Sequence, residues 1–531
     1  MLSLLICLPV IGSALLFALP EKTVRLGALT VSGLSLLWTI WLFSQYDVTN
    51  LGFQFTEHLT WIPALGLDYS LGLDGLGLLM VGMNAFLSWI AIYTTAEDVE
   101  RPKLFYALML IVNSAVAGAF MAQNFLLFFF FYEVELVPLY LLISIWGGEK
   151  RGYAATKFLL YTALSGALIL AGALGMVWLG EAASFDYEAL TKVDLSVSSQ
   201  VLLLLPLLFG FGIKIPLIPL HTWLPDTYVE SSTPVAILLG GVLAKLGTYG
   251  LLRFGFSLLP DGWQVLAPGL AVWGAITVVY GALVAIAQQD IKRMVAYSSI
   301  GHMGFILLGA AAGNTLSLSG SIAQMASHGV ILAILFALVG IIEKKVGTRE
   351  LSALNGLMNP IRGLPVISAL LVMGGMASAG LPGLINFAAE FIVFQGSFRQ
   401  FPVQTLICVV GTGLTAVYFV ILLNRTCFGR LDNERAYFPK VTLSEKMPAY
   451  VLAAVIVVLG LQPGWLLRWG EPTAVRIIIP TMKAETTLEQ PALSHGEGFT
   501  ITALLPEAHS SETLLPEAYL PEARLTETLL K

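Results

Sequence analysis

The chain has 531 residues and a formal net charge of −6; 57% of its residues are hydrophobic and only 12% are charged. Soluble domains carry about 25% charged residues, so this composition excludes a string of water-soluble domains. The hydrophobic residues stand in long runs without the alternation of an outer-membrane β-barrel, and we therefore predict an all-α polytopic membrane protein.

A helix needs about 20 apolar residues to span a membrane. The chain contains 14 such runs, at residues 2–19, 24–45, 71–95, 104–122, 124–146, 155–180, 201–229, 231–256, 264–287, 294–313, 318–342, 363–400, 403–428 and 447–469. The first run has no basic segment before it and no small-residue cleavage site after it. We therefore interpret it as a spanning helix rather than a signal peptide.

The seventh and twelfth runs carry helix-breaking residues in their interior. The seventh contains Pro216, Pro219 and Pro225, and the twelfth contains Gly380-Leu381-Pro382-Gly383. Two interrupted helices five spans apart are typical of transporters built from repeated halves. We predict one repeat over helices 4–8 (104–256) and a second over helices 9–13 (257–428). The alternative is that the prolines only kink two packed helices.

The remaining segments are helices 1–3 (1–103), helix 14 (429–470) and a tail (471–531). The tail repeats Leu-Pro-Glu-Ala at 505–508, 515–518 and 520–523. It is either flexible or extended, or it docks along a neighbouring subunit. Loops after the odd-numbered helices hold 18 Lys and Arg residues, against 3 on the other face. This bias predicts that both termini face the periplasm or an equivalent lumen.

The cysteines exclude several kinds of redox centre. Cys7, Cys408 and Cys427 lie in or beside apolar runs, and none forms a Cys-x-x-Cys pair. An iron–sulfur cluster, a structural zinc site and a disulfide framework are therefore not expected, nor is a nucleotide fingerprint present. We expect this chain to bind no redox cofactor and no metal.

Ionisable residues inside the predicted spans are the candidates for function. The charged and histidine side chains in question are Glu133, Glu135, Lys214, Lys245, His302, His328 and Glu390. A Lys or an acid at the centre of a membrane helix costs roughly 3 kcal/mol, so such residues usually pair inside the bundle and often have a function. In chain order they form a run of carboxylate, Lys, Lys, His, His and carboxylate, which we interpret as a lateral proton relay.

The residue types suit proton movement. Removal from water disfavours the charged forms of Lys and Glu, and an opposite charge nearby restores them. A Glu–Lys pair that opens and closes therefore changes how tightly the lysine holds its proton. Histidine is a natural intermediate because it titrates near neutral pH.

Each candidate also has a structural alternative. A Glu–Lys pair can be a static ion pair, His302 and His328 can simply bond a neighbouring helix, and Glu390 can be an acid favoured near a helix start. Glu133 and Glu135 are about 200° apart around a helix, so we expect only one to face the relay, with Glu135 the weaker candidate. His221 either braces the seventh helix or takes up protons. Asp74 and Arg253 are interpreted as structural residues near span ends.

Several sequence strings resemble the antiporter-like membrane subunits of respiratory complex I. They are Glu133-x-x-Leu-Val-Pro, Lys214-Ile-Pro-x-x-Pro-Leu-His-x-Trp-Leu-Pro-Asp, Leu-Ala-Lys245-Leu-Gly-Thr-Tyr-Gly, Ala-Tyr-Ser-Ser-Ile-Gly-His302-Met-Gly and Gly380-Leu-Pro-Gly-Leu-Ile-Asn-Phe-Ala-Ala-Glu390. The acid at Glu390 resembles the M-type, or chain 4, subunits. The Glu-x-Glu pair and Ile145-Trp-Gly-Gly-Glu-Lys-Arg resemble the photosynthetic branch of cyanobacteria and plastids.

The resemblance implies 14 helices in two inverted five-helix repeats, with helices 7 and 12 broken. It implies that Glu133 pairs with Lys214, that Lys245, His302 and His328 relay protons, and that Glu390 is the acid on the exit side. It further implies a thylakoid location, plastoquinone reduction and iron–sulfur clusters on partner chains, and contacts with related membrane subunits, a peripheral redox arm and lipids, but not nucleic acid. Ser231-Ser232-Thr233-Pro234 departs from the Ala-Pro-Thr-Pro of many relatives.

The sequence leaves three alternative functions for this chain. The first is a proton-translocating subunit of a complex I-like NAD(P)H or ferredoxin–quinone oxidoreductase. The second is a subunit of a multi-component sodium/proton antiporter, which shares the same strings. The third is a redox enzyme that binds quinone itself, which the missing electron-carrier motifs disfavour. The identity of co-purifying subunits separates the first two, and a quinone photolabel tests the third.

Overall fold

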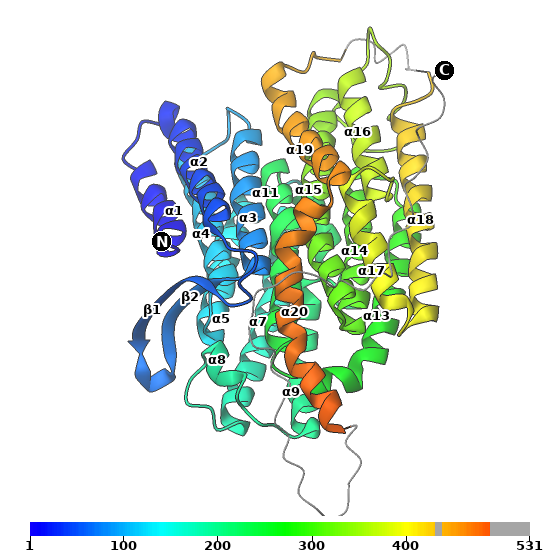
Figure 1. Ribbon diagram of the computed structural model, residues 1–531. Helices are drawn as coiled ribbons and strands as arrows, with labels where there is room; N and C mark the ends of the chain where they lie inside the picture. Colours follow the sequence, from blue (N-terminus) through cyan, green and yellow to red (C-terminus); the bar gives the residue numbers. More distant parts are fainter. Residues whose placement is uncertain (431–437, 489–531) are drawn as a thin grey trace, which may run out of the picture. The chain divides into compact units, whose positions relative to one another are not determined.

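The computed structural model describes residues 1–430 and 438–488, with side chains described as far as residue 478. Most of it is helical, and the helices lie side by side as a bundle (Figure 1). In chain order the elements of the N-terminal part are α1 (Ser3–Leu16), α2 (Glu21–Gln45), β1 (Gln54–Ile62), η1 (Pro63–Leu65), β2 (Leu67–Leu73), α3 (Gly75–Thr94), α4 (Pro102–Met121), α5 (Phe125–Val134), α6 (Leu136–Trp146), α7 (Arg151–Leu179), α8 (Tyr187–Leu190), α9 (Val197–Lys214) and α10 (Trp223–Glu230). They continue with α11 (Thr233–Leu238), η2 (Leu239–Leu243), α12 (Ala244–Gly250), η3 (Leu251–Phe256), α13 (Pro260–Ile286), α14 (Ile291–Ala312), α15 (Thr315–Val346), α16 (Pro365–Ser378), α17 (Ile385–Phe398), α18 (Pro402–Thr426), α19 (Leu443–Leu461) and α20 (Gly464–Leu488).

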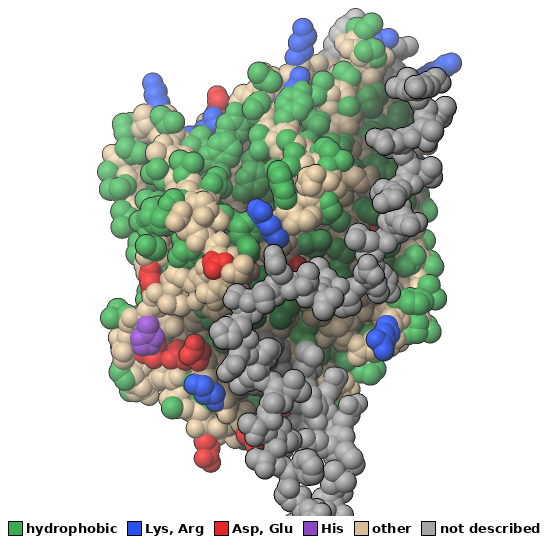
Figure 2. Space-filling view, viewed as in Figure 1, with side chains coloured by type: hydrophobic (Ala, Val, Ile, Leu, Met, Phe, Trp, Pro, Cys, Tyr) green, Lys and Arg blue, Asp and Glu red, His purple; other side chains and the backbone are tan. Residues whose placement is uncertain are grey.

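The all-α membrane fold is confirmed. Over the described residues, 12 helices are long and apolar enough to cross a membrane, and α1 and α16 are shorter apolar helices. The count of 14 spans and the domain boundaries stay predictions. Figure 2 shows hydrophobic side chains over much of the visible face, while most of its Lys and Arg side chains gather at the upper end.

Helices 7 and 12 are broken, as predicted. Helix 7 consists of α9 and α10, separated by residues 215–222, and helix 12 consists of α16 and α17, separated by residues 379–384. Gly380 and Gly383 adopt φ angles of 75° and 88°, which only glycine takes without strain. At the break in helix 12 the carbonyl of Ser378 is bonded by two buried polar side chains, His302 and Asn386.

Helix 5, predicted as one run over 124–146, is also interrupted. It consists of α5 and α6, with Glu135 between them. Pro138 explains the position, because a proline leaves the carbonyl four residues earlier without its helical partner, and that carbonyl belongs to Val134. Helix 8 (Thr233–Phe256) is irregular in another way, since the π-helical segments η2 and η3 lie on either side of α12.

A β-hairpin precedes α3, in a region for which the sequence carried no prediction. β1 and β2 pair antiparallel, with His58 opposite Ser70 and Thr60 opposite Asp68. Because β2 ends at Leu73, the span predicted from residue 71 begins only at Gly75. The carboxylate of Glu57 binds the amino terminus and accepts hydrogen bonds from the backbone of Leu2 and Ser3. Although burial opposes it, these bonds lower the pKa of Glu57.

The largest difference from prediction lies after residue 461. Helix 14 ends at Leu461, and residues 464–488 form α20 where we expected the tail to begin at residue 471. α20 packs against the start of α3, because Thr473 Oγ1 accepts a hydrogen bond from Leu76 N at 3.2 Å. In Figure 1, α20 runs down the front of the bundle, between the labels of α7 and α13. The Leu-Pro-Glu-Ala repeats lie outside the described residues.

We expect Gly75→Ala to destabilise the fold by about 1–3 kcal/mol, in the range of an overpacked core. A methyl group on residue 75 would meet the backbone carbonyl of Trp469, which cannot rotate away. The measurement is the thermal unfolding temperature of the purified protein. Gly464→Ala in α20 is the matched control, since its methyl group would meet nothing within 4 Å. Equal effects of the two changes would contradict this packing.

Candidate proton-relay site

The first buried ion pair joins Glu135 and Lys214. Lys214 is the last residue of α9, and its Nζ contacts Glu135 Oε1; the side chains are 1% and 0% exposed. The ammonium also lies 4.7 Å from the centre of the Tyr132 ring, a favourable cation–π position. Tyr132 is fixed in turn by a 2.6 Å hydrogen bond to Ser165. The break in helix 7 therefore begins directly after a lysine whose charge is balanced by Glu135.

The expected pairing of Glu133 with Lys214 is wrong. Glu133 is half-buried and its carboxylate lies against Gly166 of α7. The two acids point in different directions because they are two residues apart, and the interruption at Glu135 turns the second one inward. The second carboxylate oxygen of Glu135, Oε2, has no hydrogen-bond partner among the described residues. Of the two candidates, the one judged weaker from sequence forms the pair.

Lys245 is buried without a carboxylate. It lies in α12, and its Nζ donates a 2.5 Å hydrogen bond to the carbonyl of Gly240 in η2. No ion pair within 4.0 Å involves Lys245 in the described part of the chain. The wider π-helical turn supplies the carbonyl oxygen that solvates the ammonium. Lys245 also lies within electrostatic reach of His302 and His328.

His302 and His328 stack on one another. Their ring centroids are 5.3 Å apart with 19° between the planes. His302 Nδ1 lies 2.8 Å from the carbonyl of Ser298, and Nε2 lies 3.0 Å from the carbonyl of Ser378. A neutral imidazole has one N–H, so both bonds form together only when the ring carries a second proton. Neither ring nitrogen of His328 has a partner among the described residues.

Glu390 ends the series beside the break in helix 12. Its Oε1 accepts a 2.7 Å hydrogen bond from Asn386 and lies 3.6 Å from His302 Nε2. Its Oε2 accepts a hydrogen bond from Thr412 at 3.3 Å. Asn386 also donates to the carbonyl of Ser378 at 3.3 Å. The break thus supplies the carbonyl that holds both His302 and the amide bound to Glu390.

The structure brings the predicted residues into two groups. Glu135 and Lys214 form one, while His302, His328 and Glu390 form the other, with Lys245 in reach of the histidines. Glu133 lies outside the first pair. The polar residues Tyr132, Ser165, Ser378, Asn386 and Thr412 were not found from sequence. Their signal, a lone polar residue in an apolar run, is too common to select them.

His221 lies between α9 and α10, where the sequence placed it. Its ring is 5.1 Å from the Tyr280 ring and 6.3 Å from the Tyr297 ring, and its Nδ1 is buried without a partner among the described residues. These aromatic contacts brace the break. They do not connect His221 to the two groups above, so its role in proton uptake stays a prediction.

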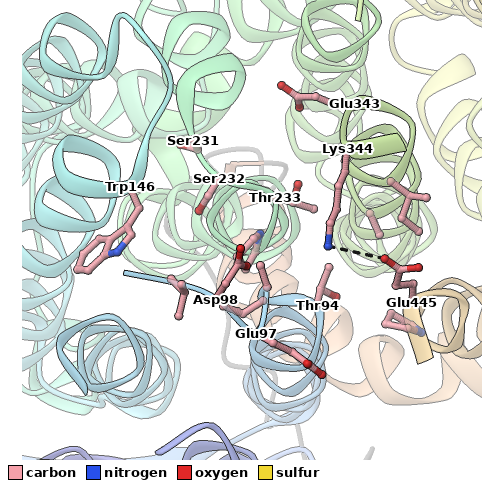
Figure 3. A pocket seen from close by; sticks show the side chains of 18 of the residues that line it. Thr94, Glu97, Asp98, Trp146, Ser231, Ser232, Thr233, Glu343, Lys344 and Glu445 are labelled. Carbon is pink, nitrogen blue, oxygen red and sulfur yellow. Dashed lines mark ion pairs between the residues drawn. The ribbon is translucent and has the colours of Figure 1, made fainter. Parts of the chain in front are cut away.

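A cavity of about 780 Å³ opens beside the link between α10 and α11. Ser231, Ser232 and Thr233 line it, so the departure from the family pattern lies in its wall (Figure 3). Lys292 reaches into this wall and donates a 2.6 Å hydrogen bond to the carbonyl of Ser231. Across the cavity Lys344 and Glu445 are 3.7 Å apart. Glu97, Asp98 and Glu343 are also in the lining, so charged side chains of both signs reach the cavity.

One group in the described part of the chain could hold a metal ion, and it is separate from the relay residues. His58, Asp68 and Asp186 place their ligand atoms within 4.8 Å of one another at the hairpin. Asp186 accepts a 3.0 Å hydrogen bond from Asn124, and burial, with the nearby charge of Asp68, raises its pKa. One imidazole and two carboxylates suit Zn²⁺ or Mn²⁺. The group is partly exposed, so it does not belong to the buried relay.

Comparisons with known proteins agree on the family. A model of the family described as "NADH:quinone oxidoreductase/Mrp antiporter, TM" matches residues 122–415, which include all six predicted relay residues. NAD(P)H-quinone oxidoreductase chain 4 1 from Nostoc sp. is 37% identical over 525 residues, covering 95% of this chain and 96% of its own. NAD(P)H-quinone oxidoreductase chain 4 2 from Thermosynechococcus vestitus is 39% identical over 477 residues, covering 87% and 89%.

Solved structures show the same fold. A chain of respiratory complex I from Thermus thermophilus with bound NADH matches with a TM-score of 0.82 at 29% identity, covering 90% of this chain and 99% of that one. A chain of the Mrp complex from Dietzia sp. matches with a TM-score of 0.81 at 21% identity, covering 92% and 99%. The chain therefore belongs to the family of NADH:quinone oxidoreductase and Mrp antiporter membrane subunits.

Proposed function

We propose that this chain is the proton-translocating membrane subunit of a complex I-like NAD(P)H or ferredoxin–plastoquinone oxidoreductase of a thylakoid membrane. Its relatives named NAD(P)H-quinone oxidoreductase chain 4, from cyanobacteria, support this assignment. Quinone reduction and the iron–sulfur clusters belong to partner subunits, including a peripheral redox arm. This chain holds no redox centre itself and acts by moving protons, next to related membrane subunits and lipids.

The observation that carries the proposal is the series of buried ionisable groups from Glu135 to Glu390. Each is almost fully withdrawn from solvent, although charges in a membrane interior are unfavourable. Among the described residues, Glu135 and Lys214 balance one another with full opposite charges, whereas Lys245 has a carbonyl and His328 has no hydrogen-bond partner. A purely structural network would satisfy all of its members.

The ion pair works as a switch in this scheme. While Glu135 holds Lys214, the carboxylate stabilises the charged ammonium. When the pair opens, the lysine sits in an apolar site without its counter-charge and gives up its proton more readily. The proton can then pass to Lys245, whose helix packs on α9, with Gly247 against the Lys214 side chain.

The histidine stack and Glu390 complete the path. A charged Lys245 repels a proton on the histidines within its reach, since like charges in a low-dielectric interior interact strongly. His302 then releases a proton toward Glu390, 3.6 Å away. Asn386 and Thr412 hold the carboxylate in position to receive it. Each proton that arrives on Lys245 thus expels one toward the acid.

We expect Lys245→Met to abolish proton pumping by the intact complex while quinone reduction with an uncoupler continues. Methionine keeps the apolar length of the side chain but carries no proton. The complex is reconstituted in liposomes, and proton uptake per quinone reduced is measured with a pH dye. Lys344→Met is the control, because that side chain is 63% exposed at the cavity. Unchanged pumping in Lys245→Met would overturn the proposal.

The alternative is a subunit of a multi-component sodium/proton antiporter. The match to the Mrp complex, at 21% identity, supports the fold but not that activity. Purification of the complex separates the two functions. Subunits that bind quinone and iron–sulfur clusters are expected to co-purify with this chain, whereas small antiporter subunits in their place would favour the alternative.

A further inference from the structure

The helix face that carries Lys245 continues away from the relay. Lys245, Tyr249 and Arg253 are spaced four residues apart, so they lie on one face of helix 8. All three are buried. At 1.5 Å per residue, Arg253 is about 12 Å further along the helix than Lys245. In this direction helix 8 runs toward the side of the membrane where α3 begins. That side is opposite the side rich in Lys and Arg.

A charged cluster closes that end. Arg253 Nη2 binds Asp74 Oδ2 at 2.6 Å, and Arg476 Nη1 of α20 lies 3.9 Å from the same oxygen. Asp74 and Arg253 are almost fully buried, with side chains 2% and 1% exposed. Two arginines on one aspartate give the cluster a net charge of +1. The sequence indicated structural roles for Asp74 and Arg253 near span ends but did not predict that they meet Arg476.

Aromatic rings surround the arginines. The Arg253 guanidinium lies 5.0 Å from the Phe53 ring and 5.3 Å from the Tyr249 ring, and Arg476 lies 3.7 Å from the Phe53 ring. Nε and Nη1 of Arg253 have no acceptor among the described residues. The guanidinium groups lie against ring surfaces, and among the described residues no second acid pairs with the two arginines, so one positive charge of the cluster stays uncompensated there.

Between this cluster and Lys245 lies a layer of buried aromatic rings. Phe120 and Tyr249 are 5.2 Å apart, Phe125 and Phe254 stack at 4.0 Å, and Phe128 contacts both Tyr249 and Phe254. All five rings are buried. The Tyr249 hydroxyl donates its hydrogen to the carbonyl of Phe120 at 3.0 Å, so it is not available to pass a proton on.

We propose that Asp74, Arg253 and Arg476, together with the five buried aromatic rings, form a positively charged seal. This seal blocks direct proton passage between Lys245 and the side of the membrane where α3 begins. A fixed arginine charge excludes protons from a narrow path, as in other selective membrane proteins. Protons on Lys245 then leave only through the histidines and Glu390. The inference rests on the proposed function, because it concerns the route of the pumped proton.

The size of the effect follows from Coulomb's law. A unit charge at Arg253, about 12 Å along helix 8 from Lys245, changes the occupancy of a proton on Lys245 about tenfold at an effective dielectric constant of about 20. Arg476 lies at the same Asp74 oxygen as Arg253, so we assign its charge an effect of the same order. Removing one arginine charge leaves a neutral Asp74–Arg253 pair. Removing the aspartate charge leaves two positive charges instead. The two substitutions therefore have opposite electrical effects on the same cluster.

The test measures passive proton flux through the complete complex in liposomes, with a pH gradient and without an electron donor. We expect Arg476→Gln to raise this flux about tenfold. Asp74→Asn keeps the cap on α3, because asparagine caps a helix as well as aspartate does. Its flux is expected to stay at or below the wild-type value. Equal increases in both variants would show that packing, not charge, forms the seal and would overturn the proposal.

A second pair of variants locates the leak and checks assembly. Adding Lys245→Met to Arg476→Gln is expected to return the flux to the wild-type value, because the leak passes through Lys245. A leak that persists in the double variant, or no leak in an assembled Arg476→Gln complex, would overturn the seal. Assembly is checked by uncoupled quinone reduction. Because the flux needs no electron transfer, this result is independent of whether Lys245→Met alone abolishes pumping.

Discussion

Glu135→Gln is expected to abolish proton pumping by the intact complex, whereas Glu133→Gln leaves most of it. Glu135 forms the buried ion pair with Lys214, while Glu133 lies half-buried against α7. Removing one partner of a buried pair costs about 3–5 kcal/mol, because the remaining charge is left without compensation. Lys214 then loses the charge that sets its hold on a proton. Proton uptake per quinone reduced, compared between the two variants, is the measurement.

Loss of folding has to be separated from loss of function in this comparison. The double variant Glu135→Gln/Lys214→Met removes both charges, so we expect it to recover the assembly and stability that Glu135→Gln loses, since no buried charge remains unpaired. Pumping should stay absent in the double variant. A larger pumping defect in Glu133→Gln than in Glu135→Gln would mean that the observed pair is not the working one.

Glu390→Gln is expected to stop proton release while the fold stays intact. Glutamine has nearly the same shape, so it keeps an oxygen for the Asn386 amide and stays near Thr412. It cannot take up a proton from His302, which lies 3.6 Å from the carboxylate. We expect proton uptake per quinone to fall as far as in Lys245→Met, with a small effect on the unfolding temperature.

Two comparisons make this result specific. Glu390→Asp keeps the charge but shortens the side chain, so partial pumping is expected. Glu97→Gln changes an acid whose side chain is 87% exposed and should leave pumping unchanged. If Glu390→Gln pumps normally, the relay does not end at this acid and the path through the histidines needs another exit.

The features that could be predicted from sequence are those set by single residues with strong local effects. The breaks in helices 7 and 12 follow from Pro216, Pro219 and Gly380-Leu381-Pro382-Gly383, because proline and glycine act on their own backbone. The buried Lys and Glu residues were also visible, because a charge in an apolar run stands out. Lys245, His302, His328 and Glu390 all lie inside the bundle, as expected.

The choice between Glu133 and Glu135 could not be made in the same way. It depends on the exact point where helix 5 is interrupted. Pro138 favours an interruption near Val134, because it removes the backbone hydrogen bond to the Val134 carbonyl. An ideal helix predicts that the two acids face different sides but not which side faces Lys214. The rotation of the helix in the bundle decides that, and it depends on contacts with α7 and α9.

The hairpin and α20 were missed for a different reason. α20 contains Glu471, Pro472 and Arg476 and lacks a continuous apolar run, so hydropathy places it with the tail. It is held by contacts far away in sequence, such as the hydrogen bond from Leu76 N to Thr473. In the hairpin, the strand from Gln54 to Ile62 mixes polar and apolar residues without a strict alternation, so neither a long apolar run nor a clean strand pattern marks it.

The hydrogen bond between Leu76 and Thr473 also fixes an order of events during synthesis. Its two residues are 397 positions apart, so at about 5–20 residues per second the ribosome makes the acceptor roughly 20–80 s after the donor. Throughout that interval the first turn of α3 lacks this partner, and even after Arg253 has been made Asp74 still lacks Arg476 beside it. A chain in the membrane at this stage differs locally from the finished subunit, although most of its helices have already been made.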